Sequence, residues 1–81
     1  MLSRVQFYSQ LKEVVGSGEV ALELPAGATI ADLLVRLYRD HPALEKWDRN
    51  LLIGVGVEFA GRDYVIRPGD EIALMPPLQG G

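Results

Sequence analysis

The sequence predicts an α+β domain in which one main helix packs on one face of a mixed sheet of four to five strands. Two short segments near the N-terminus alternate apolar and polar residues, which is typical of half-buried strands. One longer segment repeats apolar residues at helical spacing, and apolar strand-like runs follow it. The order strand, strand, helix, strands favours a roll with the helix on one face of the sheet.

The first strand is expected in "LSRVQFY", where Val5 and Phe7 share one face. The second is expected in "EVALEL", which Pro25 closes. Between them, "SQLKEVVG" predicts one or two helical turns, with Ser9 as the N-cap and Gly16 as the stop. Two strands joined by so short a connection most simply form a hairpin.

The segment "TIADLLVRLYRDHP" predicts the main helix. Its apolar stripe has the spacing of an amphipathic helix and consists of Ile30, Leu33, Leu34, Leu37 and Tyr38. Thr29 is a suitable N-cap, with Asp32 three residues later in a capping-box position. Pro42 disfavours helical geometry in the residue before it, so the helix should end near Asp40. In the connection that follows, Trp47 is expected to cover the underside of the core.

The C-terminal half predicts the remaining strands. The run "LLIGVGV" is apolar on both sides, which indicates an inner strand. One face of this strand should present Leu51, Ile53, Val55 and Val57. A turn at Gly61 and a short strand over residues 64–66 follow. After the tight turn of "RPGD", the last strand is "EIALM", with Ile72 and Leu74 facing inward.

Composition argues against several classes of protein. The 81 residues have room for a single core, and 48% apolar with 23% charged residues is ordinary for a globular domain. There is no cysteine, hence no disulfide framework and no thiolate zinc site. A net charge of −3 without a basic stripe argues against partners such as nucleic acid or a membrane surface. Without a signal peptide or a spanning segment, the expected location is the cytoplasm.

The side chains offer no catalytic constellation. His41 is the only histidine, so it has no partner for a metal site and is expected to be a loop residue at a helix end. The carboxylates are scattered, and a neighbouring pair such as Asp70 and Glu71 points to opposite sides of a strand. We therefore expect no permanently bound cofactor, no metal and no conventional enzyme activity.

The last residues, "PPLQGG", predict a different kind of site. Residues 1–75 are expected to form the domain, and residues 76–81 an extended tail that ends in Gly-Gly. Pro76 and Pro77 keep the chain extended, and glycines without Cβ atoms can enter a narrow channel. The carboxylate of Gly81 could then reach an active site in another protein and react once a nucleotide activates it. The alternative is a frayed terminus without a function.

The whole chain resembles the β-grasp, ubiquitin-like sulfur carriers, and among them the small subunits of molybdopterin synthase. The resemblance rests on "VQFYSQLKEVVG", on "LPAGATIADLLVRL" and above all on "LLIGVGVEFAGRDYVIRPGDEIALMPPLQGG". It implies a β-grasp fold. It also implies that an activating enzyme uses ATP to adenylylate Gly81, and that a sulfur donor then converts this terminus to a thiocarboxylate.

The resemblance further implies a partner, the large subunit of molybdopterin synthase, with which the small subunit forms a heterotetramer. The large subunit would supply the catalytic side chains, and Gly81 would donate sulfur to a pterin precursor of the molybdenum cofactor. The residues implied in partner binding are Phe59, Met75, Pro76, Pro77, Leu78, Gln79 and Gly80. For Phe59 and Met75 the alternative is ordinary packing in the core.

Other functions stay open at this point. The chain could carry sulfur to thiamin or another acceptor, act as a ubiquitin-like protein modifier, or be a binding module with an idle tail. The segment "YRDHPALEKWDRN" favours the molybdopterin branch, because thiamin-pathway carriers are usually shorter between the helix and the third strand. Val55-Gly56 departs from the "VN" that family members often have there, which leaves the pathway open.

Overall fold

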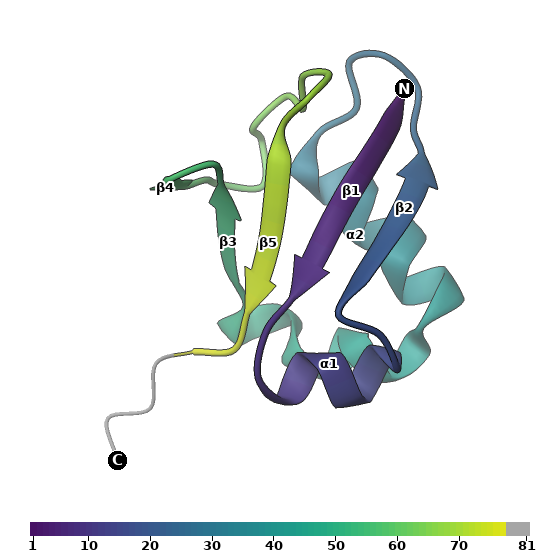
Figure 1. The fold of residues 1–81 in the computed structure, drawn as a ribbon, viewed down its shortest axis with the longest axis vertical. Helices are drawn as coiled ribbons and strands as arrows, with labels where there is room; N and C mark the ends of the chain where they lie inside the picture. Colours follow the sequence, from purple (N-terminus) through teal and green to yellow (C-terminus); the bar gives the residue numbers. More distant parts are fainter. Residues whose placement is uncertain (78–81) are drawn as a thin grey trace.

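The computed structural model describes residues 1–77, in which a single sheet has α2 packed across one face (Figure 1). The elements in chain order are β1 (Leu2–Phe7), α1 (Gln10–Val15), β2 (Glu19–Glu23), α2 (Ile30–Asp40), the 3₁₀ helix η1 (Pro42–Asn50), β3 (Leu52–Val55), β4 (Glu58–Phe59) and β5 (Glu71–Met75). The five strands lie in the order β2-β1-β5-β3-β4, with β1 and β5 parallel and the other neighbours antiparallel. The predicted α+β class and β-grasp roll are confirmed.

The N-terminal hairpin forms as predicted, with β1 and β2 paired in antiparallel register. The connecting helix α1 ends at Gly16, which has a left-handed φ of 88° and donates its N–H to the Lys12 carbonyl at 2.7 Å. Ser9 occupies the N-cap position, but its side chain makes no capping hydrogen bond. The short helix is therefore held by its C-cap and by one buried leucine.

The main helix α2 begins and ends where the sequence predicts. The Thr29 hydroxyl accepts from the Asp32 N–H at 3.2 Å, and the Asp32 carboxylate accepts from the Thr29 N–H at 2.9 Å. Together these bonds form a capping box. The helix stops at Asp40, two residues before Pro42. The connection is more helical than predicted, because η1 fills it, and Trp47 packs half-buried against the core as expected.

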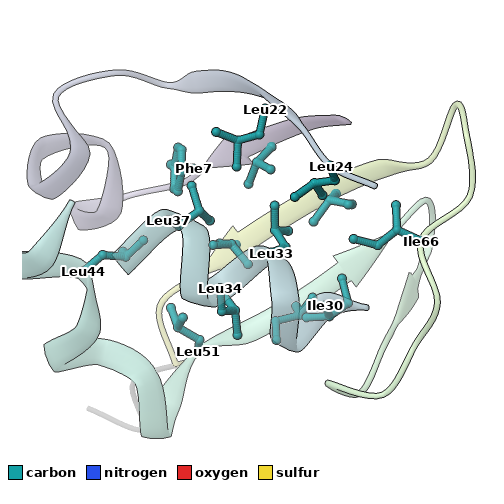
Figure 2. Close-up of a cluster of buried hydrophobic side chains, with 14 of the residues drawn as sticks. Phe7, Leu22, Leu24, Ile30, Leu33, Leu34, Leu37, Leu44, Leu51 and Ile66 are labelled. Carbon is teal, nitrogen blue, oxygen red and sulfur yellow. The ribbon is translucent and has the colours of Figure 1, made fainter. Parts of the chain in front are cut away.

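The core lies between α2 and the sheet (Figure 2). The helix contributes the buried part of its apolar stripe, and the strands contribute alternate side chains. The buried residues include Val5, Phe7, Leu22, Leu24, Ile30, Leu33, Leu34, Leu37, Leu44, Leu51, Ile66, Ile72 and Leu74. Full burial of one such aliphatic or aromatic side chain stabilises the fold by about 1.5–3 kcal/mol.

Two predictions for the C-terminal half are wrong. The strand expected to reach Val57 ends at Val55, because Gly56 adopts a left-handed φ of 63° and turns the chain back into β4. Val57 therefore lies fully exposed at the tip of this hairpin and not on the inner face. The strand expected over residues 64–66 is a single β-bridge at Val65. The edge of the sheet beside β3 is formed by the short β4.

Candidate functional site

One face of the sheet packs on α2, and the other face is open. On β5, Ile72 and Leu74 are buried in the core. The alternate residues Ala73 and Met75 therefore project from the open face. The register places Leu52 of β3 opposite Met75, and directly opposed residues share a face of the sheet.

The open face has a polar half and an apolar half. Over β2, β1 and the start of β5 it carries mainly charged and amide side chains, among them Arg4, Gln6, Glu19 and Glu71, together with the exposed Leu2. Over the C-terminal part of β5 and over β3 and β4 the surface is apolar. We call this part the apolar half-face, and it consists of Tyr8, Leu52, Gly54, Phe59, Ala73 and Met75. A contiguous exposed apolar patch with a polar border is typical of an interaction surface.

Phe59 and Met75 belong to this surface. Phe59 lies on β4 and is 72% exposed, so the alternative of core packing is excluded for it. Met75 is half-buried and lies across Gly54, where an added Cβ atom would come within 3.4 Å of the Met75 Cε atom. Because Gly54 has no side chain, there is room for Met75 to lie over it on the apolar half-face.

A groove of about 480 Å³ lies between Phe59 and the start of the tail. It is lined by Tyr8, Ser9, Gln10, Leu52, Phe59, Met75, Pro76 and Pro77. A second hollow of about 260 Å³ shares Tyr8, Phe59 and Met75 with the groove and extends over Gly54 and Ala73. Phe59 thus borders both hollows, and each offers space for an apolar side chain of a partner.

The chain leaves the sheet directly after β5 (Figure 1), and Pro76 is the first residue beyond that strand. The Tyr8 N–H donates to the Leu74 carbonyl at 3.2 Å, in the pattern of the parallel β1–β5 ladder. The next donor in register would be the amide nitrogen of residue 76, but proline carries no N–H. The Tyr8 carbonyl instead accepts from the Leu11 N–H at 3.1 Å. Pairing of β5 therefore ends at Met75, and the two prolines lie half-buried along the groove.

The structure brings together four of the residues implied in partner binding, since Phe59, Met75, Pro76 and Pro77 all line the groove. The others, and the predicted reacting residue, lie outside the described residues; these are Leu78, Gln79, Gly80 and Gly81. The assignment of all of them to partner binding or reaction stays a prediction.

Sequence reasoning missed part of the groove. Tyr8 and Leu52 could have been found by alternation, because each directly follows a buried residue and so points to the opposite face. Ser9 and Gln10 could not, because their place beside the tail depends on the turn between β1 and α1. Ser9 has a φ of 53° in that turn, a conformation that side-chain-bearing residues seldom adopt.

A cluster of titratable side chains links α2, η1 and the loop after β4. The Tyr38 hydroxyl and Arg62 Nη1 both donate to Asp48 Oδ1, the latter at 2.8 Å, and Arg62 Nη2 donates to the Asp48 carbonyl oxygen at 2.5 Å. The hydrogen bond from Tyr38, and then that from Arg62, hold the pKa of Asp48 below its usual range. Burial, and then the hydrogen bond to Asp48, raise the pKa of Tyr38 above its usual range. None of the three lines the groove, so the cluster ties elements together and does not face the site.

Two further observations concern other kinds of site. Within residues 1–77, no three His, Asp or Glu side chains gather as metal ligands. In the same part of the chain, no helix is both long enough and apolar enough to cross a membrane. His41 lies at the C-terminal end of α2, as predicted, and its backbone N–H donates to the Leu37 carbonyl at 2.7 Å.

Comparison with known proteins decides the family. The family model of ThiS matches residues 5–81 of the sequence. The chain belongs to the ThiS family. The match begins within β1 and continues through every later element, so the resemblance predicted from the sequence is confirmed over nearly the whole ThiS-family chain.

Individual relatives of this ThiS-family member cover all or nearly all of its length. It is 32% identical over 83 residues to the molybdopterin synthase sulfur carrier subunit of Chlamydomonas reinhardtii, with 100% of both chains covered. It is 36% identical over 84 residues to small archaeal modifier protein 1 of Haloferax volcanii, with 94% of this chain and 97% of that protein covered. The crystal structure of SAMP1 from Haloferax volcanii superimposes with a TM-score of 0.86 at 30% identity, and 100% of each chain is covered.

Proposed function

We propose that this ThiS-family member is the sulfur carrier subunit of a molybdopterin synthase. The observation that carries the proposal is the apolar half-face, whose groove adjoins the start of a tail that ends in Gly-Gly. A carrier needs a surface that docks on other proteins and a slender terminus that reaches their active sites. The algal relative, 32% identical over its whole length, is described by this function and supports the proposal. The proposed location is the cytoplasm.

The proposed chemistry takes place at Gly81. In an activating enzyme, a carboxylate oxygen of Gly81 attacks the α-phosphorus of ATP, which forms an acyl-adenylate and releases pyrophosphate. Sulfur from a sulfide-equivalent donor then attacks the carbonyl carbon, displaces AMP and leaves a thiocarboxylate. In the large subunit this sulfur bonds to a carbon of the pterin precursor and displaces an oxygen substituent from that carbon. Water then adds to the carbonyl carbon and breaks its bond to sulfur, so that the sulfur stays on the pterin and the carboxylate returns. ATP is consumed, and no cofactor stays bound to the carrier.

The proposed partner surface is the apolar half-face together with the tail. Phe59 is 72% exposed in the free chain and therefore available to a partner, and aromatic anchors dominate many interfaces. The residues proposed to contact the large subunit are Phe59, Met75, Pro76, Pro77, Leu78, Gln79 and Gly80. Two copies of each subunit would form the proposed heterotetramer.

Intact-mass measurement tests the proposal. After incubation with the activating enzyme, ATP and a sulfur donor, the mass of the chain should rise by the difference between sulfur and oxygen. A chain that lacks Gly81 is the control, and its mass should not change. The proposal is wrong if the full chain never gains this mass, or if the shortened chain still supports molybdopterin synthesis.

A protein modifier is the second candidate, because the modifier of Haloferax volcanii is 36% identical to this chain. In that case the activated carbonyl of Gly81 would be attacked by a lysine amine of another protein, with release of AMP and formation of an isopeptide bond. Adducts that survive denaturation and require Gly81 would favour this function. Loss of thiamin rather than the molybdenum cofactor after deletion of the gene would favour a carrier for another acceptor.

A further inference from the structure

We propose that Arg62 is a positioning residue for docking: by holding Asp48 of η1, it keeps β4 where Phe59 borders the groove. The inference rests on the proposed function, because the affinity for the large subunit is one of its readouts. Arg62 acts through the position of Phe59 and does not itself line the groove.

The strand that carries Phe59 has few interactions of its own. It consists of Glu58 and Phe59, lies at the edge of the sheet beside β3 and, within residues 1–77, pairs only with β3. Phe59 is mostly exposed, so no core packing fixes its side chain. On the N-terminal side of β4 the chain turns through Gly56 and the fully exposed Val57. A segment with so few buried contacts opens locally at low free-energy cost unless something else holds it.

Arg62, three residues after Phe59, connects the end of β4 to the rest of the domain through its contact with Asp48. Its guanidinium spans the side-chain carboxylate of Asp48 at 2.8 Å and the backbone carbonyl of Asp48 at 2.5 Å. Such a two-point contact uses the fixed fork of the arginine donors and restricts both position and direction. The Arg62 carbonyl also accepts from the Ala31 N–H at 2.9 Å. The loop after β4 is thus tied to η1 and α2, which bury Leu44 and Leu34 in the core.

The same contact should matter more for affinity than for stability. The Arg62 and Asp48 side chains are each 41% exposed, and ion pairs of that kind stabilise a fold little. A docking residue that is already in place, however, saves the cost of ordering it on binding. Loss of the contact should therefore weaken binding by roughly five-fold while the fold stays intact.

The experiment is a double-mutant cycle on the full chain. The dissociation constant for the large subunit is measured for wild type, Arg62→Gln, Phe59→Ala and the double variant. Arg62→Gln should weaken binding roughly five-fold on its own and have no further effect in the Phe59→Ala background. Arg62→Lys, which keeps the charge but loses the fork, should lie between wild type and Arg62→Gln. Arg39→Gln is the matched control. Arg39 is 69% exposed on α2, and its substitution by glutamine removes the same charge as Arg62→Gln.

Hydrogen exchange tests the inference without a partner. The Ala60 N–H donates to the Ile53 carbonyl at 2.8 Å and therefore reports whether the end of β4 is in place. Its exchange should be faster in Arg62→Gln, whereas amides of β1 should keep their wild-type rates, which also shows that the variant is folded. Unchanged exchange at Ala60 overturns the inference, and so does an equal loss of affinity with and without Phe59. Failure of the wild-type chain to bind the large subunit would count against the proposed function alone.

Discussion

Phe59 is an aromatic side chain that the fold leaves in solvent. Its burial would ordinarily stabilise the domain by about 1.5–3 kcal/mol, but in the free chain it is 72% exposed. Tyr8 and Met75 border the same hollows and continue the apolar surface around it. A large apolar side chain in such a place should contribute much to binding and little to folding.

Phe59→Ala should raise the dissociation constant for the large subunit at least ten-fold, about 1.4 kcal/mol or more. The free energy of unfolding should change by no more than about 0.5 kcal/mol, because the side chain is mostly exposed. Titration calorimetry and urea unfolding measure the two quantities. Val35→Ala is the control, because Val35 is also an exposed apolar residue but lies on α2. This substitution should alter neither the dissociation constant nor the free energy of unfolding. Equal weakening by both substitutions would contradict the assignment of the apolar half-face as the docking surface.

A second prediction at the scale of residues concerns Asp48 and the pH dependence of the free energy of unfolding. Its pKa is lower in the folded than in the unfolded chain, because Tyr38 and Arg62 donate hydrogen bonds to the carboxylate. Such a group stabilises the fold above its unfolded pKa of about 3.9, and the contribution disappears as pH falls through the lower folded pKa. Asp48→Asn should therefore reduce the free energy of unfolding at neutral pH, by less than about 1 kcal/mol because the pair is partly exposed.

The comparison is made by urea unfolding of both proteins from neutral pH down to below the folded pKa. The difference between wild type and Asp48→Asn should shrink to nothing in acid, where Asp48 is protonated in both states. A difference that persists there would show that the ionised carboxylate is not its source.

Among the elements, α2 illustrates how a short sequence signal can act independently of the rest of the chain. Its limits follow from the capping box at its start and from the proline after its end. The short β4 is the opposite case. It exists because Gly56 turns the chain and because β3 offers a partner edge, and its own two residues would not form a strand without them.

Thr29→Ala should lower the free energy of unfolding by about 1 kcal/mol, because the Asp32 N–H loses its side-chain acceptor. Thr29→Ser keeps the hydroxyl and should recover most of the loss. Chemical unfolding of the three proteins measures the differences. If serine and alanine are equally destabilising, the methyl group of Thr29 and not the capping bond is responsible.

At the scale of the whole molecule, the two faces of the sheet have separate roles. One face, with α2, buries the core, and the other carries the polar and apolar halves. The tail begins at the edge of the apolar half, where Pro76 ends the pairing of β5. Under the proposed function, folding and reaction belong to different parts of the chain, which leads to a test.

Removal of Gly80 and Gly81 should leave the free energy of unfolding within about 0.5 kcal/mol of wild type, because the core residues lie elsewhere. The shortened chain should still be captured by the large subunit through the apolar half-face. Sulfur incorporation, followed by intact mass, should be abolished. Capture that disappears together with the two glycines would place the docking energy in the tail and not on the sheet.

Most of the fold could be predicted, because local patterns decide it. The stripe around Leu37 and the capping box at Thr29 predicted α2, and alternation around Val5 and Ile72 predicted the strands. The strand predicted through Val57 was wrong, because apolar alternation continues through a glycine whether or not that glycine turns the chain.

The sequence by itself determined β1, β2, α2 and β5, the inward side of these strands and the proline pair followed by Gly-Gly, since these depend on residue types at short spacing. Only the tertiary structure decided that β5 lies between β1 and β3, and that Tyr8, Leu52 and Phe59 therefore meet around the start of the tail. The same holds for the contact between Asp48 and Arg62. The physical reason is that the groove and the Asp48–Arg62 contact each join residues far apart in the chain. The distances between these residues are set by strand order and packing, which no local pattern contains.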